Sequence, residues 1–488
     1  MRLQQDNYTN TSVRVRWWKK PLSAKALMQI FLVCVCCGLF ALTSGRALDA
    51  VRASSNVVGA QDWNQYLHDP QNTAASNETI LSTANVSQLT RLWTFKTGAG
   101  IAAGAAVVGN TVYVGSWDGY EYALDLATGA QKWKTFLGQS VNKECQPSTI
   151  GVTSSALVDN GTIYVGGGDN YWYALDAATG NVLWKVDTGD NSAAGGHYNW
   201  SSPLIANGFA YIGIASNCDL PLVQGQLWKV DLSSHQVVGK TSFVPDGQVG
   251  GGVWTRPAID SATNTIYVTT GTQSLFTQTL PQAIVSVDAA TMAIKDSWQI
   301  PLQESNIDAD FGNSPILFTD ARGRQLVAAT NKNGYTYAWD RAHLSAGPVW
   351  QQATNIGGEC PVCGDGSVSS GAYADGRLFL AGGNAVINGV GFAGVVRALD
   401  PTTGAYLWEH ALPNPVIPAI VYDNGLLIDA SGPTIEVLDA ATGHRLYSYQ
   451  TGFTSYGPPA VANGTIIEGS GDGVIYALAL STKTVTPP

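Results

Sequence analysis

The sequence predicts an all-β protein, an eight-bladed β-propeller built from four-stranded antiparallel blades. The main reason is a phrase that recurs along the 488 residues: residues 122–133 and 173–184 both read Tyr-Ala-Leu-Asp-x-Ala-Thr-Gly-x-x-x-Trp. Less exact copies, spaced 39 to 60 residues apart, return around Asp231, Asp288, Asp340, Asp400 and Asp439, and a last copy has Ala479 at the aspartate position. Such a period indicates a repeat architecture. The 54 glycines and a charged fraction of only 13% suit a turn-rich β protein.

Each repeat predicts four strands. The β-rich runs 154–158 and 162–166 are separated by a turn containing Asn160-Gly161, which is a strong hairpin signal. The repeated phrase then supplies a third strand that ends at its aspartate. Its glycine can adopt the positive φ of a tight turn, and a fourth strand begins near its tryptophan.

A single four-stranded sheet cannot cover both of its faces, so neighbouring sheets must pack against it, and radial closure achieves this with only short exposed edges. The two ends of the repeat region favour such a ring. The last copy, at 476–479, is not followed by a tryptophan strand, whereas an unpaired strand-like run at 92–95 precedes the first full repeat. We therefore predict that the strand with Trp93 completes the last blade of a propeller spanning 61–482.

The N-terminal region predicts export. Residues 26–45 contain no charged residue and are long enough to cross a bilayer as a helix, either as an uncleaved anchor or as a cleaved signal segment. The basic residues within 1–25 place that segment on the cytoplasmic side. Residues 46–60 are interpreted as a linker and 483–488 as a tail. The predicted location is extracytoplasmic, either membrane-anchored or secreted.

Four cysteines follow the apolar segment, which suits two disulfides in an oxidising compartment. Cys360 and Cys363 can close locally, and Cys145 can meet Cys218 if their loops adjoin. A redox pair or half a zinc site are the alternatives for the Cys-x-x-Cys pair, but no second pair completes a metal set. Gly364 stands where a haem attachment motif requires histidine. The net charge of −10 argues against a nucleic-acid partner.

A ligand of a propeller is expected in the central channel, held by loops that are longer than their neighbours. The unusually long loops are 139–151, 187–202, 215–226 and 301–314, with the glycine-rich run 250–256 beside them.

The repeated phrase resembles the tryptophan-docking motif of the pyrroloquinoline quinone (PQQ) dependent dehydrogenases, especially their polyvinyl alcohol dehydrogenase-like branch. Noncatalytic propellers such as the outer-membrane assembly lipoprotein BamB carry similar repeats. More specifically, Gly-Gly-Gly-Val-Trp at 250–254, followed by 258–260 and 266–271, is similar to the segment whose tryptophan forms the floor under the quinone. The resemblance implies this role for Trp254, because a rigid indole stacks well on a planar ring. Packing between blades is the alternative role.

The stretch 306–315 resembles the family segment that holds the catalytic aspartate. It implies that Asp310 is the base that takes the hydroxyl proton of an alcohol. Asp308 is its neighbour, and Ala309 stands where the family usually has tryptophan. Two solvated loop carboxylates are the alternative.

Residues 331–335 are similar to the family motif whose cation polarises the quinone carbonyls, which implies this role for Lys332. An ordinary surface lysine in a hairpin turn is the alternative.

The resemblance also implies PQQ and Ca²⁺ as cofactors. Asp219, at the end of the run 216–219, aligns with a glutamate ligand of the metal, and Thr272 occupies the position of an asparagine ligand. Ser201 and Thr153 are predicted to bind the cofactor.

Two functions from different classes therefore remain. The first is an exported quinoprotein dehydrogenase that oxidises a small or polymeric alcohol or polyol and passes electrons to an external acceptor, since the chain has no haem motif of its own. The second is a noncatalytic propeller that binds a protein or another partner in the cell envelope, as BamB does.

Overall fold

The computed structural model describes residues 61–76, 78–305 and 308–481, which belong to one compact unit. The predicted basic segment 1–25, anchor or signal segment 26–45, linker 46–60 and tail 483–488 lie outside the described residues. Within the described ranges, no helix is both long and apolar enough to cross a membrane.

Eight antiparallel four-stranded blades make up the described chain. Blade 1 comprises β3 (Ala106–Val108), β4 (Thr111–Gly115), β5 (Tyr120–Asp125) and β6 (Gln131–Phe136), and blade 2 comprises β9 (Leu157–Asp159), β10 (Thr162–Gly166), β11 (Tyr171–Asp176) and β12 (Val182–Asp187). Blade 3 comprises β14 (Leu204–Ala206), β15 (Phe209–Ser216), β16 (Gln226–Asp231) and β17 (Gln236–Ser242), and blade 4 comprises β18 (Ala258–Asp260), β19 (Thr265–Thr269), β20 (Ala283–Asp288) and β21 (Ile294–Gln299). Blade 5 comprises β22 (Ile316–Thr319), β23 (Gln325–Thr330), β24 (Tyr335–Asp340) and β25 (Trp350–Ala353), and blade 6 comprises β26 (Ala372–Ala374), β27 (Arg377–Gly382), β30 (Gly394–Leu399) and β31 (Tyr406–Leu412). Blade 7 comprises β32 (Val421–Asp423), β33 (Leu426–Ser431), β34 (Thr434–Asp439) and β35 (Arg445–Gln450), and blade 8 comprises β36 (Ala460–Ala462), β37 (Thr465–Gly469), β38 (Val474–Leu480) and β2 (Leu89–Lys96).

Short elements accompany the blades. They are β1 (Ala75–Ser76), β7 (Ser140–Val141), β8 (Thr149–Ile150), β13 (His197–Tyr198), β28 (Ala385–Ile387), β29 (Val390–Phe392) and the 3₁₀ helices η1 (Val86–Gln88), η2 (Leu344–Ala346) and η3 (Pro361–Cys363).

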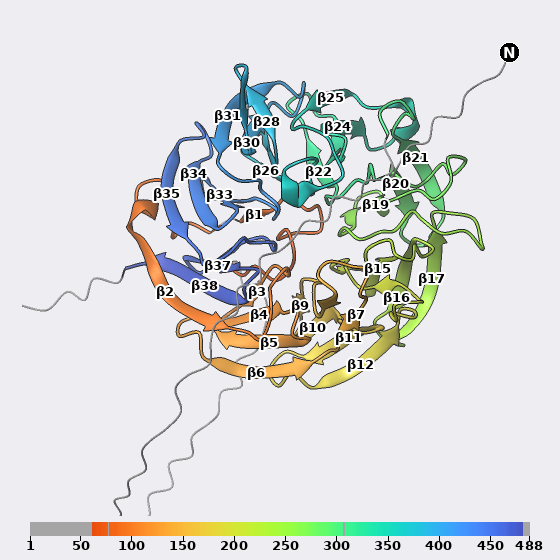
Figure 1. Cartoon of the computed structure of the whole chain (residues 1–488), viewed down its shortest axis with the longest axis horizontal. Coiled ribbons are helices and arrows are strands. Elements are labelled where there is room, and N and C mark those ends of the chain that lie inside the picture. The colour runs from red at the N-terminus through yellow and green to blue at the C-terminus, as the bar shows by residue number, and fades with distance from the viewer. Residues whose placement is uncertain (1–60, 77, 306–307, 482–488) are drawn as a thin grey trace, which may run out of the picture. The chain divides into compact units, whose positions relative to one another are not determined.

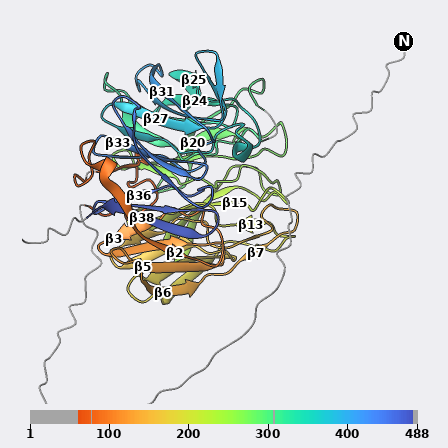
Figure 2. The ribbon, with the colours of Figure 1, turned by 60° about the vertical axis from the view of Figure 1, so that its left-hand side comes forward.

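The blades follow one another around a ring (Figure 1), which confirms the predicted fold class. The ring closes as the sequence predicted. Strand β2, which carries Trp93, pairs antiparallel with β38 at the end of the propeller, with Trp93 opposite Ala477. The two strands lie side by side in both views (Figures 1 and 2). One sheet therefore joins the two ends of the repeat region.

The repeated aspartate and threonine build the turn between the third and fourth strands. Asp125 Oδ1 accepts hydrogen bonds from the backbone N–H groups of Ala127 and Thr128 and from the Thr128 hydroxyl. This side-chain turn replaces backbone partners that the reversing chain lacks. The same pattern recurs at Asp176, Asp288 and Asp439.

The tryptophan and glycine of the phrase join one blade to the next. Trp93 Nε1 donates to the Leu126 carbonyl of blade 1 at 2.7 Å. A Cβ atom on Gly129 would lie 2.7 Å from the same indole, so only glycine allows the ring to approach this closely. Equivalent contacts join Trp133 to Gly180, Trp350 to Gly404 and Trp408 to Gly443. Inter-blade packing is thus the role of these tryptophans.

Residues 61–76 (red in Figure 1) pack along the inner strands of the blades. Their backbone is hydrogen-bonded to Val107, Val158, Ile259, Leu317, Tyr373 and Tyr422, each on the innermost strand of a different blade. The fully buried Arg256 guanidinium binds this segment through Gln65, Asn72 and the Asp69 carbonyl. The segment therefore satisfies inner-strand edges that would otherwise remain unpaired.

Candidate active site

Five of the predicted residues lie on loops at one end of blades 3, 4 and 5. Trp254 is in the connection from β17 to β18, and Asp310 is in the connection from β21 to β22. Asp219, Thr272 and Lys332 lie between the second and third strands of their blades. In an antiparallel four-stranded blade these two kinds of connection emerge at the same end, which is why residues far apart in the chain converge.

Asp310 is the centre of this cluster and is almost fully buried, with 4% of its surface exposed. Its Oδ2 atom accepts a hydrogen bond from Trp254 Nε1 at 3.3 Å and lies 3.5 Å from Lys332 Nζ. The Lys332 ammonium makes its shorter ion pair, 2.8 Å, with Asp308 Oδ1. The predicted floor, base and cation are therefore in direct contact, and Asp308 joins them.

Thr272 connects Asp310 to Asp219. Its hydroxyl lies 3.0 Å from Asp310 Oδ1 and 2.6 Å from Asp219 Oδ2. A hydroxyl has one proton to donate, so it can serve only one ionised carboxylate at a time. The other contact requires a proton on a carboxyl group or a cation nearby. The two residues predicted as metal ligands thus contact the predicted base directly or through one hydroxyl.

Two glycines allow the indole to sit against the carboxylate. A Cβ atom at Gly271 would lie 3.2 Å from Trp254 Nε1 and 3.3 Å from Asp310 Oδ2. A Cβ atom at Gly312 would lie 2.9 Å from the far edge of the indole and 2.6 Å from a methyl group of Val368. Any larger side chain at either position would displace the ring.

Burial governs the protonation of the cluster. Burial raises the pKa of the Asp310 carboxyl to about 7, an effect that the Lys332 charge opposes and the charges of Asp308 and Asp219 reinforce. Burial also raises the pKa of Asp308, against the attraction of Lys332. For Lys332, burial alone lowers the pKa, but the surrounding carboxylates outweigh it and raise the pKa above its ordinary value. The Asp310 carboxyl is therefore poised to titrate near neutral pH, and the lysine stays charged.

The donor set fits a hard cation. One carboxylate oxygen from each of Asp219, Asp308 and Asp310 lies within 4.8 Å of the others, and these residues range from exposed to buried. If all three are ionised, Lys332 leaves two negative charges without compensation. Oxygen ligands with excess negative charge are what Ca²⁺ and similar cations prefer.

Comparison with known proteins reveals the family of this propeller. The model of a family described as outer membrane protein assembly factor BamB matches residues 77–352 and 323–485. The chain belongs to this family of PQQ-like β-propellers.

Among the relatives of this protein, a polyvinylalcohol dehydrogenase of Sphingopyxis sp. (strain 113P3) is 24% identical over 419 residues, covering 75% of this chain and 62% of the relative. The chain thus spans about three-fifths of the length of that relative. A quinoprotein ethanol dehydrogenase of Pseudomonas putida is 24% identical over 510 residues, covering 78% of this chain and 80% of the relative. The solved structure of a europium-containing methanol dehydrogenase superposes with a TM-score of 0.71 at 18% identity, covering 86% of this chain and 98% of that one. At this identity the superposition establishes the fold alone.

The residues of this PQQ-like propeller also fit a flat, anionic cofactor. The Trp254 indole is only half-buried, and the Lys332 ammonium lies 5.7 Å from its centroid. A planar platform with a fixed cation beside it suits a quinone that carries negative charge. Trp254 and Lys332 would hold PQQ, and Asp219, Asp308, Asp310 and Thr272 would hold a cation.

Ser201 and Thr153 do not contact this cluster through any hydrogen bond found in the described residues. The Ser201 hydroxyl donates to the Thr255 carbonyl at 2.8 Å, next to Trp254 in the chain. Thr153 Oγ1 accepts from Trp117 Nε1 at 3.0 Å and lies 2.7 Å from the Tyr198 hydroxyl. Ser201 thus supports the Trp254 loop, and Thr153 belongs to an aromatic group. Their role in cofactor binding stays a prediction.

Trp117 is a half-buried aromatic residue at this end that the sequence analysis missed, although a signal exists. Its turn, Ser-Trp-Asp-Gly-Tyr at 116–120, aligns with Asn-Lys-Asn-Gly-Tyr at 331–335 when the repeats are superimposed. Trp117 therefore occupies in blade 1 the position that Lys332 occupies in blade 5. The ring of Trp117 stacks on Tyr456 with centroids 5.9 Å apart.

Both predicted disulfides are present, joining Cys145 to Cys218 and Cys360 to Cys363. The first links two long loops at the site end of the propeller and directly precedes Asp219. It therefore anchors one of the residues that reach Thr272.

Proposed function

We propose that this propeller is a PQQ-dependent dehydrogenase that oxidises an alcohol or polyol and passes the electrons to an external acceptor. The observation that carries the proposal is the direct contact of Asp310 with Trp254 and Lys332, with the pKa of the buried carboxyl raised to about 7. The alcohol dehydrogenase relatives support the same reaction class.

PQQ, when bound, supplies an electrophilic quinone that accepts two electrons from the alcohol carbon. The chain itself provides the groups around that reaction. The Trp254 indole supports the cofactor from one side, and the Lys332 ammonium stabilises negative charge that develops on oxygen. A cation held by the three aspartates would act as a Lewis acid at the same place.

Asp310 has the position and the pKa of a general base. Without a cation its pKa is about 7, and a bound cation would lower the pKa, so the carboxyl group would be ionised at neutral pH and able to accept the hydroxyl proton. The Thr272 hydroxyl bridges Asp310 to Asp219, which is partly exposed to solvent. A proton taken up by Asp310 can therefore pass to Thr272 Oγ1 as the threonine proton moves to Asp219 and then to water.

The proposal places the protein outside the cytoplasm. The disulfides Cys145–Cys218 and Cys360–Cys363 support an oxidising compartment. We further propose that residues 26–45 anchor the chain in the membrane or direct its secretion.

Reconstitution tests this function. Purified full-length protein is incubated with PQQ and Ca²⁺, or with PQQ and a lanthanide, and examined for an absorbance band of bound quinone and for alcohol-dependent dye reduction. We expect both signals, and we expect Asp310→Asn to keep the band but lose at least about 100-fold in dye reduction. Asp159→Asn, which changes an aspartate on β9 in blade 2, is the matched control. An unchanged rate in Asp310→Asn would contradict the assignment of the base.

A noncatalytic scaffold is the second candidate. The family model itself is named for an assembly factor, and Ala309 and Thr272 depart from the dehydrogenase pattern. Absence of the quinone band at a large excess of PQQ and cation, with the protein folded, would favour this candidate.

A further inference from the structure

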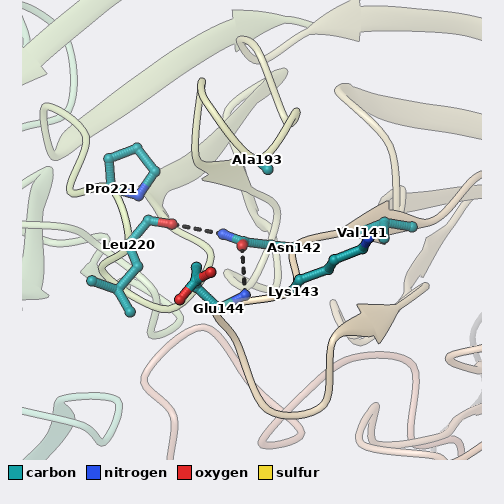
Figure 3. Close-up of a pocket in the computed structure, with 7 residues that line it drawn as sticks. All are labelled: Val141, Asn142, Lys143, Glu144, Ala193, Leu220 and Pro221. Atoms are coloured by element: carbon teal, nitrogen blue, oxygen red, sulfur yellow. Dashed lines mark hydrogen bonds between the residues drawn. The ribbon is translucent and has the colours of Figure 1, made fainter.

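A groove with a volume of about 490 Å³ lies at the site end of blades 1 to 3 (Figure 3). Its walls come from the loop after β6, the loop after β12 and the loop between β15 and β16. Most of the lining is carbon, and Val141 and Leu220 each expose 54% of their surface. This volume is within the range of sites that hold small organic molecules.

The groove adjoins the candidate active site in the chain. Leu220 and Pro221 line it and directly follow Asp219, whose carboxylate reaches Thr272. The disulfide between Cys145 and Cys218 fixes the two walls immediately beside this point. For a molecule whose reacting end lies at Asp310, the groove is therefore the nearest apolar surface beyond Asp219 along the chain.

The walls are preformed, and the side-chain amide of Asn142 is already hydrogen-bonded. Asn142, which has 3% of its surface exposed, donates from Nδ2 to the Leu220 carbonyl at 2.6 Å and accepts at Oδ1 from the Glu144 N–H at 3.0 Å (Figure 3). A second hydrogen bond between the walls runs from Asn217 Nδ2 to Ser140 Oγ at 3.2 Å. A hydrocarbon can cover this part of the groove without leaving the amide of Asn142 unpaired.

The charge of the lining favours an uncharged ligand. Lys143 and Glu144 are its two charged residues and carry opposite charges, so the groove has no net charge. A hydroxy acid or a quaternary ammonium alcohol would find no compensating excess charge there. The lining instead offers apolar surface for carbon chains.

We propose that this groove binds the hydrocarbon chain of the alcohol substrate beyond its reacting carbon. The proposal rests on the function proposed above and defines its substrate class: alcohols with an uncharged carbon chain, preferred over ethanol. Each methylene that is fully buried contributes roughly fourfold to binding. An open groove buries each one in part, so hexanol should exceed ethanol by at least about tenfold.

Ala193 and Ala194 provide a matched pair of variants. Both are exposed on the same turn, but only Ala193 lines the groove. Ala193→Trp fills the groove with an indole, whereas Ala194→Trp adds the same side chain beside it. Because both positions are exposed, neither substitution disturbs the core, and circular dichroism of each variant checks the fold.

Two measurements on the full-length protein test the proposal. Calorimetric titration of 1-hexanol and of ethanol, without added PQQ, measures binding alone. Dye reduction by the reconstituted protein measures kcat/KM for the same alcohols. We expect hexanol binding and the tenfold preference in the wild type and in Ala194→Trp, and their loss in Ala193→Trp with ethanol kinetics unchanged.

Each result has one meaning. Equal preference for hexanol in both variants, or no hexanol binding to the wild type, overturns the groove proposal. If hexanol binds and Ala193→Trp abolishes this binding, but no alcohol reduces the dye, then the groove binds alcohols and the proposed dehydrogenase function fails.

Discussion

The buried Asp310 carboxyl predicts a specific dependence of stability on pH. Burial raises its pKa from the ordinary value of 3.8 to about 7 in the folded protein. Between these values the folded state binds more protons than the unfolded state, so the free energy of unfolding falls as the pH rises. The difference between the two pKa values corresponds to about 4 kcal/mol of stability, which is fully lost only above about pH 7.

Asp310→Asn removes the charge and keeps a side chain of the same shape, whose carbonyl can still accept from Trp254 or Thr272. We expect the variant to have a stability close to that of the wild type near about pH 4 and to exceed it by up to about 4 kcal/mol near about pH 8. Urea unfolding in the presence of a chelator measures this difference, with Asp159→Asn as the control. A difference between Asp310→Asn and wild type that does not change with pH would refute the assignment of a raised pKa to this carboxyl.

Two further predictions concern the blade contacts and the acidic cluster. Gly129→Ala should lower the free energy of unfolding by about 3 kcal/mol, because it combines backbone strain with a clash against Trp93. Gly161→Ala, also at positive φ but in open space, should cost about 1 kcal/mol. Equal costs of the two substitutions in urea unfolding would contradict the contact between Gly129 and Trp93. Ca²⁺ or La³⁺ at about 100 times its dissociation constant should stabilise the protein by about 2.7 kcal/mol. This shift should vanish in Asp219→Asn and persist in the exposed loop variant Asp246→Asn, and a shift that survives in Asp219→Asn would place the cation elsewhere.

Much of the fold could be predicted because the residues that determine the structure of a blade lie within each repeat. Asp125 and Thr128 of the repeated phrase form the turn, and its glycine and tryptophan form the contact between blades. The closing strand with Trp93 was predictable because the last repeat lacks its fourth strand. By contrast, residues 61–76 bind the inner strands mainly through backbone atoms, which leave no pattern in the side chains.

The sequence indicated which residues come together in the candidate site, but not which ion pairs and hydrogen bonds they form. The loops 250–256 and 301–314 pointed to Trp254 and Asp310, and the family resemblance added Lys332; these three side chains are in contact. Lys332 lies closer to Asp308 than to Asp310, and this depends on side-chain conformations that the spacing of residues in the sequence does not predict. The hydroxyl of Thr153 is hydrogen-bonded to Trp117 and Tyr198, contacts that the sequence did not indicate, and its role in cofactor binding stays a prediction.

The departures from the dehydrogenase pattern are accommodated within the site. Ala309 has no exposed surface and belongs to the core cluster that includes Phe311 and Trp339, so the small residue is part of the packing between blades. The Thr272 hydroxyl lies between two carboxyl groups and can accept a proton from one while donating its own to the other, whereas an asparagine amide would not relay a proton. We propose that threonine at this position lowers the affinity for a cation, because a hydroxyl is a weaker metal ligand than an amide carbonyl, and provides a proton route between the buried Asp310 and the partly exposed Asp219. The two effects can be separated, since Thr272→Asn should tighten cation binding and slow proton release.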